Sequence, residues 1–333
     1  NTTYYNELDL AMSLGARHER SETGARDEVY RTVAGFVNTW DATDHDTYNN
    51  DRNNTAFNIG IEKGVNKNLS IYGSYSESFR IPNIDEHIKA TTSGNFHLED
   101  QESDGIEIGL LYQNDQIDIN ASYYNMDTKN EIQYNQSVNT NLDPIERQGI
   151  NIDLDYKIDE KQKIMSSFNF TEAEFTSGTL TPGSGGAGAC NYDNTTYCSN
   201  SSTWQNLMGG GTSYSLAGKS VPLISPITYS INYVNKFRSD MTFNLGIKYN
   251  DERYVSNDQE NIEPKIPDYY LINTSLSSNN GPYVYKVGIN NLTNERIYDF
   301  AISSTFHDDA HYGLSNVYPL PERNYFVDFK YTF

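Results

Sequence analysis

The stretch GINIDLDYK, residues 149–157, decides the fold because its side chains alternate strictly between apolar and polar. The apolar or aromatic set is Ile150, Ile152, Leu154 and Tyr156, and the polar set is Asn151, Asp153, Asp155 and Lys157. Successive side chains of an extended chain point to opposite faces, so the pattern predicts a β-strand with one apolar face and one polar face.

The same alternation recurs along the chain. Further examples are residues 8–16, 57–61, 69–75, 106–110, 117–123, 227–233, 241–249, 270–276, 283–289 and 325–333. We expect about twelve such strands of roughly ten residues each, which is the length that a tilted strand needs to cross a bilayer. One further stretch, VYRTVAGFVNTW at residues 29–40, is interpreted as strand-like structure within a loop.

The connections between these strands alternate between short and long. The short ones are residues 64–68, 113–115, 159–162, 236–239 and 279–281, and the long ones are 80–102, 127–147, 176–222, 251–267 and 292–323. Bacterial outer-membrane barrels have short periplasmic turns and longer extracellular loops. The pattern therefore favours an all-β, antiparallel transmembrane β-barrel, with a soluble β-sandwich as the alternative whose apolar face would pack on a second sheet.

The last ten residues, NYFVDFKYTF (324–333), carry the same stripe up to Phe333. A closed barrel has no free edge, so we expect this last strand to pair with the first one.

Composition narrows the class of partner. The 333 residues include 45 Asp and Glu against 24 Lys and Arg, for a formal net charge of −21. Nucleic-acid binding needs clustered basic residues, so nucleic acid is not an expected partner. The chain also holds 27 Tyr and 14 Phe, too many aromatic residues for a disordered chain. No apolar run is long enough for a membrane-spanning helix, and we expect no leader segment at Asn1.

Several motifs go beyond a generic barrel. Residues 68–87, NLSIYGSYSESFRIPNIDEH, contain Phe-Arg-Ile-Pro at 79–82, and residues 94–113 read GNFHLEDQESDGIEIGLLYQ. Residues 266–278, 285–300 and 318–333 read IPDYYLINTSLSS, YKVGINNLTNERIYDF and YPLPERNYFVDFKYTF. In order and spacing these segments resemble the barrel of TonB-dependent outer-membrane receptors, although Phe96 and His97 stand where that family often has Pro-Asn.

The resemblance implies a fold and an activity. Such receptors have about twenty-two strands and an N-terminal plug that engages TonB. Residues 1–333 would then be a partial, C-terminal barrel domain without the plug, although closure as a small barrel stays open. The implied protein is no enzyme. It is an active transporter in the bacterial outer membrane, bounded by lipid and lipopolysaccharide, energised by the TonB complex through the plug. The transported ligand would be a ferric siderophore or another iron complex, with haem or cobalamin as alternative ligands. A passive porin is the alternative function. No resident cofactor is expected.

Candidate ligand contacts come from the long loops. They are Arg80, His87, His97, Tyr134, Trp204, Tyr254 and Tyr312. His87 and His97 flank the motif region, and this pattern resembles that of haem receptors of the family, which have a haem-ligating histidine between the two motifs. The alternative is that both are ordinary loop histidines.

Two further features of the loops invite a chemical interpretation. His307 and His311 in HDDAH would share one face of a helix and suit a divalent metal ion, and a solvated loop is the alternative. Cys190 and Cys198 lie in one Gly- and Ser-rich loop, and we expect them to form a disulfide. No nucleophile–base–acid constellation is recognisable in the sequence.

Overall fold

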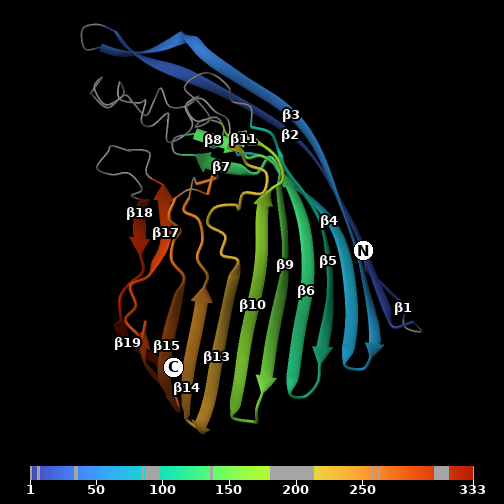
Figure 1. Cartoon of the computed structure of the whole chain (residues 1–333), viewed down its shortest axis with the longest axis vertical. Helices are drawn as coiled ribbons and strands as arrows, with labels where there is room; N and C mark the ends of the chain where they lie inside the picture. The colour runs from blue at the N-terminus through green and yellow to red at the C-terminus, as the bar shows by residue number, and fades with distance from the viewer. Residues whose placement is uncertain are drawn as a thin grey trace.

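The computed structural model describes the chain except residues 1, 6–7, 34–36, 84–85, 87–97, 136–137, 181–213, 257, 262, 304–314 and 333. One antiparallel sheet of 13 strands dominates, in the order β1-β2-β3-β4-β5-β6-β9-β10-β13-β14-β15-β16-β19. Figure 1 shows it as a curved wall with its strands roughly upright. Neighbouring strands of this sheet follow one another along the chain, so the wall is an up-and-down meander.

The wall strands from β4 onward have 8 to 14 residues, near the length expected for a membrane crossing, whereas β1 has 4 residues and β2 and β3 have 24 and 30. Their bounds are β1 Thr2–Tyr5, β2 Leu10–Val33, β3 Val37–Asn66, β4 Leu69–Arg80, β5 Gln101–Gln113, β6 Ile117–Lys129, β9 Ile145–Lys157, β10 Gln162–Phe175, β13 Ile227–Arg238, β14 Met241–Asn250, β15 Tyr269–Asn280, β16 Tyr283–Asn290 and β19 Asn324–Tyr331. Three small hairpins stand outside the wall, formed by β7 Ile132–Asn135 with β8 Val138–Asn141, β11 Thr179–Leu180 with β12 Tyr214–Ser215, and β17 Tyr298–Ser303 with β18 Ser315–Pro319.

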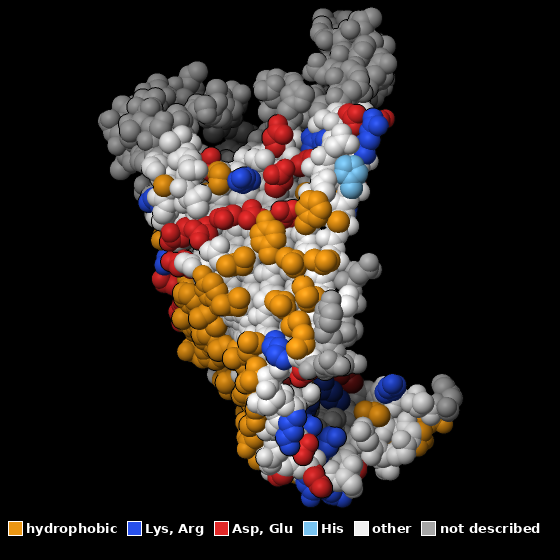
Figure 2. Space-filling view, turned by 90° about the vertical axis from the view of Figure 1, so that its right-hand side faces the viewer, with side chains coloured by type: hydrophobic (Ala, Val, Ile, Leu, Met, Phe, Trp, Pro, Cys, Tyr) orange, Lys and Arg blue, Asp and Glu red, His pale blue; other side chains and the backbone are white. Residues whose placement is uncertain are grey.

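The apolar face of the wall is uncovered, as a barrel requires. Ile106, Ile108 and Leu110 of β5 are 50%, 58% and 39% exposed. In the last strand, Tyr325, Val327 and Phe329 are 70%, 77% and 60% exposed. Figure 2 shows such side chains gathered in a belt on the outer surface. No second sheet packs on this face in the described part of the chain, which contradicts the sandwich alternative.

The connections alternate as predicted. At one end β3–β4, β5–β6, β9–β10, β13–β14 and β15–β16 are joined by turns of two to four residues. The β15–β16 turn has Gly281 at φ 59°, a left-handed conformation that glycine adopts without a Cβ clash. At the other end the connections after β4 are long and contain all three small hairpins, while β2 and β3 are joined by three residues. We call this end the loop end and the opposite end the turn end.

The expected pairing of the last strand with the first is not present. Among the described strands, β19 pairs with β16 alone and β1 pairs with β2 alone, so these two are the edges of the sheet. In Figure 1 these two edges lie on opposite sides of the wall. Phe333 lies outside the described residues.

Residues 29–40 also differ from the prediction. Residues 29–33 and 37–40 are the ends of β2 and β3, which pair with each other from Leu10↔Lys63 to Val33↔Val37. Only Asn58–Asn66 of β3 pairs with β4, so the rest of this hairpin forms a two-stranded ribbon beyond the wall (Figure 1).

The buried cores lie at the loop end and not within the wall. One cluster joins Ile145 and Phe175 at the ends of β9 and β10 to Leu216 and Val221 of the following connection. A second joins Val255 and Ile266 to Ala301 of β17. These clusters tie the long connections down onto the top of the wall.

Within the described ranges, the structure has no helix of sufficient length and apolar character to cross a membrane.

Candidate functional site

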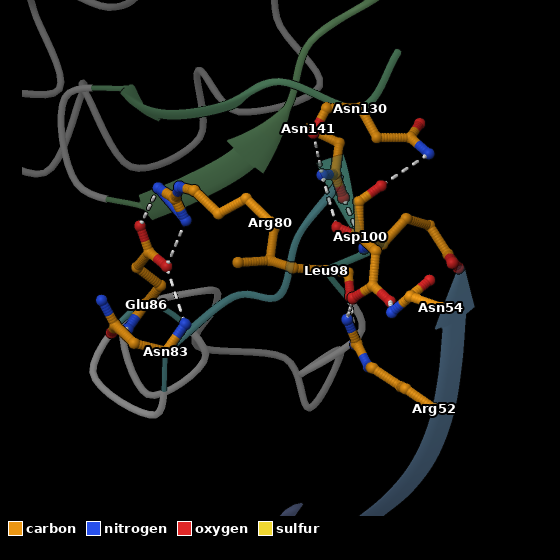
Figure 3. A network of polar contacts seen from close by, with 10 residues as sticks. Arg52, Asn54, Arg80, Asn83, Glu86, Leu98, Asp100, Asn130 and Asn141 are labelled. Carbon is orange, nitrogen blue, oxygen red and sulfur yellow. Dashed lines mark hydrogen bonds and ion pairs between the residues drawn. The ribbon is translucent and has the colours of Figure 1, made fainter. Parts of the chain in front are cut away.

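The loop end of β4 carries the first candidate residue, Arg80, whose guanidinium forms a bidentate pair with Glu86. Its Nη1 and Nη2 atoms donate to the Glu86 carboxylate over 2.9 and 2.6 Å. The Glu86 carboxylate also accepts from the Asn83 amide over 2.8 Å, and the Glu86 amide donates to Asn83 Oδ1 over 3.0 Å. Figure 3 shows this closed loop of contacts. Arg80 is therefore held in place while its side chain stays 46% exposed.

A second set of contacts holds residues 98–100, just before β5. The Asp100 carboxylate pairs with the Arg52 guanidinium and accepts from Asn54 Nδ2 over 2.6 Å. Arg52 Nη2 donates to the Leu98 carbonyl oxygen over 2.5 Å. The Arg52 and Asp100 side chains are only 8% and 13% exposed, so this is a buried ion pair (Figure 3). Through it, the β2–β3 ribbon is joined to the start of β5.

The connection between β14 and β15 contains the third group. The Lys265 ammonium lies 4.9 Å from the centre of the Tyr254 ring and donates to Glu252 over 2.7 Å. The Glu252 carboxylate raises the pKa of Lys265 above its ordinary value. Tyr254 is half-buried, and its ring makes a cation–π contact with Lys265.

Arg253 belongs to the same connection and is 5% exposed. It pairs with Asp299, and Tyr269 Oη donates to the Asp299 carboxylate over 2.9 Å. Burial raises the pKa of the nearby Glu260 carboxyl, and Asp258 and Glu263 add to that shift. The loop end thus combines fixed cations with several carboxylates.

The inner face of the wall below these loops is polar. A hollow of about 340 Å³ is lined by small hydroxyl side chains and by Glu107, including Ser74, Ser76 and Ser78 of β4 and Ser103 of β5. The Glu107 carboxylate accepts from Tyr72 Oη over 2.6 Å. This surface can offer hydrogen bonds to whatever fills the interior.

Most of the predicted ligand contacts lie outside the described residues. These are His87, His97, Trp204 and Tyr312, together with the metal candidates His307 and His311 and the disulfide candidates Cys190 and Cys198. Tyr134 lies in β7, but its side chain is outside the described part. Arg80 and Tyr254 both lie at the loop end, but in separate groups of contacts. The ligand, metal and disulfide assignments therefore stay predictions.

Sequence reasoning missed Arg52, Asp100, Asn54 and Asn141. Arg52 and Asp100 are 48 positions apart, and no periodicity connects them. The only local signal is the polar run around Arg52, which also suits a solvated ribbon. In the residues that the structure describes, no group of three or more His, Cys, Asp or Glu is placed to hold a metal ion.

Comparison with known proteins now decides the family. The family model described as TonB dependent receptor-like, beta-barrel, matches residues 1–292. The chain belongs to this family. Members of the TonB-dependent receptor family are transport receptors of the bacterial outer membrane, so this barrel lies in that membrane with its loop end outward.

Solved structures of the same family share this fold. The siderophore receptor PiuA from Acinetobacter baumannii is 16% identical with a TM-score of 0.68, covering 96% of this chain and 40% of that one. The ferric yersiniabactin uptake receptor FyuA from Yersinia pestis is 11% identical with a TM-score of 0.70, covering 98% and 43%. The copper transporter OprC is 13% identical with a TM-score of 0.67, covering 98% and 46%.

The chain therefore spans less than half the length of these TonB-dependent receptors and transporters. No curated protein sequence matches it.

Proposed function

We propose that residues 1–333 form part of the barrel wall of a receptor that imports a scarce nutrient across the outer membrane, energised through TonB. In this proposal the plug that engages TonB belongs to another part of the receptor. The chain supplies the lipid-facing wall, the polar inner face and a set of external loops.

The match of the TonB-dependent receptor model to residues 1–292 carries this proposal. The geometry agrees with it in two respects. The inner wall is lined with hydroxyl groups and Glu107, which suits a water-filled or plug-filled interior. The long connections gather at one end, where external ligands arrive.

We propose a ferric siderophore or another iron complex as the ligand. PiuA is named as a siderophore receptor and FyuA as a ferric yersiniabactin receptor, and both have this fold. The copper transporter OprC has the same fold, so the fold alone does not determine which metal is transported. Arg80 and Tyr254, together with Tyr134, Trp204 and Tyr312, are the proposed contacts, while His87 and His97 would be needed for haem. Cobalamin is a further alternative ligand within the same family.

An uptake assay tests the proposal. The full receptor gene would be expressed in a bacterium that lacks its own iron-complex receptors. Cells would then be offered radiolabelled iron as ferric catecholates, ferric hydroxamates, ferric citrate or haem, or labelled cobalamin. We expect uptake of one iron complex that requires both the receptor and TonB.

Two outcomes contradict this proposal in different ways. Uptake that persists without TonB, with steady ion conductance in planar bilayers, would indicate a passive porin. TonB-dependent uptake of cobalamin or haem alone would keep the transport mechanism and replace the ligand.

A further inference from the structure

The β7–β8 hairpin belongs to one long connection of the loop end and contacts another. It is inserted between β6 and β9, and its strands pair from Ile132↔Asn141 to Asn135↔Val138. Asn139 and Asn141 are two positions apart in β8, so their side chains share one face of that strand. Both side chains contact the connection between β4 and β5, which belongs to a different part of the chain.

Asn141 holds the end of that connection nearest β5. The Glu99 amide donates to Asn141 Oδ1 over 2.7 Å, and Asn141 Nδ2 donates back to the Glu99 carbonyl oxygen over 3.1 Å. The same Nδ2 lies 2.8 Å from the carbonyl oxygen of Asn130, where β6 ends. Asn130 Nδ2 in turn donates to the carbonyl oxygen of Asp100 over 3.3 Å (Figure 3). A single amide side chain therefore satisfies both backbone groups of Glu99.

Asn139 holds the end of the connection nearest β4. Its Nδ2 atom donates to the carbonyl oxygen of Glu86 over 2.8 Å. Glu86 is the residue that Arg80 fixes through its bidentate pair. The two asparagines thus bind residues 86 and 99, which lie near opposite ends of the same connection.

Both of these ends are fixed a second time. Arg80, at the end of β4, holds Glu86, and Arg52 of the β2–β3 ribbon holds Asp100 beside Glu99. One end is therefore attached to the wall and the other to the ribbon, and both are attached to β8. A displacement of β8 would pull on both ends together.

We propose that the β7–β8 hairpin, as part of the β6–β9 connection, is a strut that couples the two ends of the β4–β5 connection into one mechanical unit. Residues 83, 86, 98–100 and 138–141 then open and close together. This inference goes beyond transport itself and does not depend on the identity of the ligand.

Amide hydrogen exchange on the intact receptor, without ligand, tests the strut. The variants are Asn139→Ala, which removes the contact to Glu86, and Asn141→Ala, which removes the contacts to Glu99. A neutral hydrogen bond contributes about one factor of ten in stability, so we expect about tenfold faster exchange at the end that each variant releases. The strut adds a cross-effect: Asn139→Ala also speeds exchange of the Glu99 amide, and Asn141→Ala also speeds exchange of the Glu86 amide.

The control is Asn120→Ala, which makes the same substitution in β6 away from the loop end. It should leave exchange at both ends unchanged. If Asn141→Ala prevents folding, Asn141→Ser serves as the milder variant, and Asn139→Ala tests the cross-effect alone. If each variant speeds exchange only at the end it contacts, or at neither end, the strut is wrong.

Discussion

Removal of the Arg52 side chain should be costly, because its charge is buried and little water can reach Asp100 to replace it. Breaking a buried ion pair by removing one partner costs about 3–5 kcal/mol. We expect Arg52→Ala to lower the local opening free energy of residues 98–100 by about 3 kcal/mol, measured by amide hydrogen exchange. The double variant Arg52→Leu with Asp100→Leu should recover part of that loss, since it leaves no unpaired charge.

Arg20→Ala is the matched control for this prediction. Arg20 also pairs with two carboxylates, Asp51 and Glu22, but its side chain is 60% exposed. Water can replace those partners, so protection of residues 98–100 should not change. An equal effect of the two substitutions would show that burial does not determine the strength of the Arg52 contact.

Glu260 gives the β14–β15 connection a dependence on pH. Burial raises the pKa of its carboxyl above the ordinary value of 4.5, and Asp258 and Glu263 add to the shift while Lys219 opposes it. A carboxyl with a raised pKa holds its proton more tightly in the folded state, so the contribution of Glu260 to stability is greatest at low pH. It falls as the pH rises from about 4.5 through the folded-state pKa.

We therefore expect Glu260→Gln to abolish this loss and to stabilise the connection at neutral pH. The measurement is amide exchange of Asn261, whose N–H donates to the Asp258 carbonyl, corrected for the intrinsic rate at each pH. A connection that is more stable at neutral than at acid pH in the unmodified protein would contradict the prediction.

The residues in these predictions show where sequence reasoning stops. Arg80 was a candidate because it ends a strand and stands in a recognisable motif. Arg52, Asn54 and Asn141 gave no such signal, because each acts through a partner more than 40 positions away. Such contacts depend on how the long connections fold back, which no local pattern encodes.

Among the elements, β4, β5, β6, β9 and β10 share a row of like charges on the outer face. The cross-strand register places Glu77 beside Asp104, then Asp127, Glu146 and Glu174. Figure 2 shows an acidic band along the border of the apolar belt. In the described part of the chain none of the five forms an ion pair with Lys or Arg. Like charges directly opposite each other destabilise a sheet.

We therefore expect Asp127→Asn, at the centre of this row, to stabilise the barrel by about 0.2–1 kcal/mol at low salt. The gain should shrink as salt screens the repulsion. Glu102→Gln is the opposite test on the same two strands, because Glu102 lies beside Lys129 and its neutralisation removes an attraction. The free energy of unfolding of each variant is measured in low and in high salt. If Asp127→Asn and Glu102→Gln change this free energy in the same direction, the argument from the cross-strand register is refuted.

Strands and turns were well predicted wherever one face is apolar and the other polar. Residues 150–156 lie within β9, and each predicted short turn lies between two paired strands. The prediction failed in the stretch 29–40, where residues 29–33 belong to β2 and residues 37–40 to β3. That ribbon extends beyond the wall, so neither of its faces is selected to be apolar and the alternation that marks a strand is lost.

For the whole molecule, the decisive property is the contact between the outer face and lipid. Ile108 is 58% exposed near the middle of β5, on the apolar face. We expect Ile108→Arg to destabilise the barrel by about 2–4 kcal/mol in lipid vesicles, because a cation at that depth loses its water. Asn120→Arg, on the inner-facing side of β6, should have little effect. Equal costs for the two variants in reversible unfolding experiments would show that the faces were assigned wrongly.

The sequence predicted this two-sided wall but not its edges. Closure was expected from the apolar stripe of residues 325–333, yet a stripe only shows that a strand lies in a wall. The total number of strands and the curvature of the sheet determine which strand pairs with the free side of β19. In the structure β1 and β19 are the edges of the sheet.

The meander order of the wall limits how proteins of this kind can change in size. Each strand of the sheet runs opposite to the one before it, so odd and even strands end on opposite sides of the membrane. Gain or loss of one strand would invert everything downstream, moving the Arg80 and Asn141 contacts into the periplasm. Growth by whole hairpins avoids this inversion and leaves every later connection on its original side of the membrane.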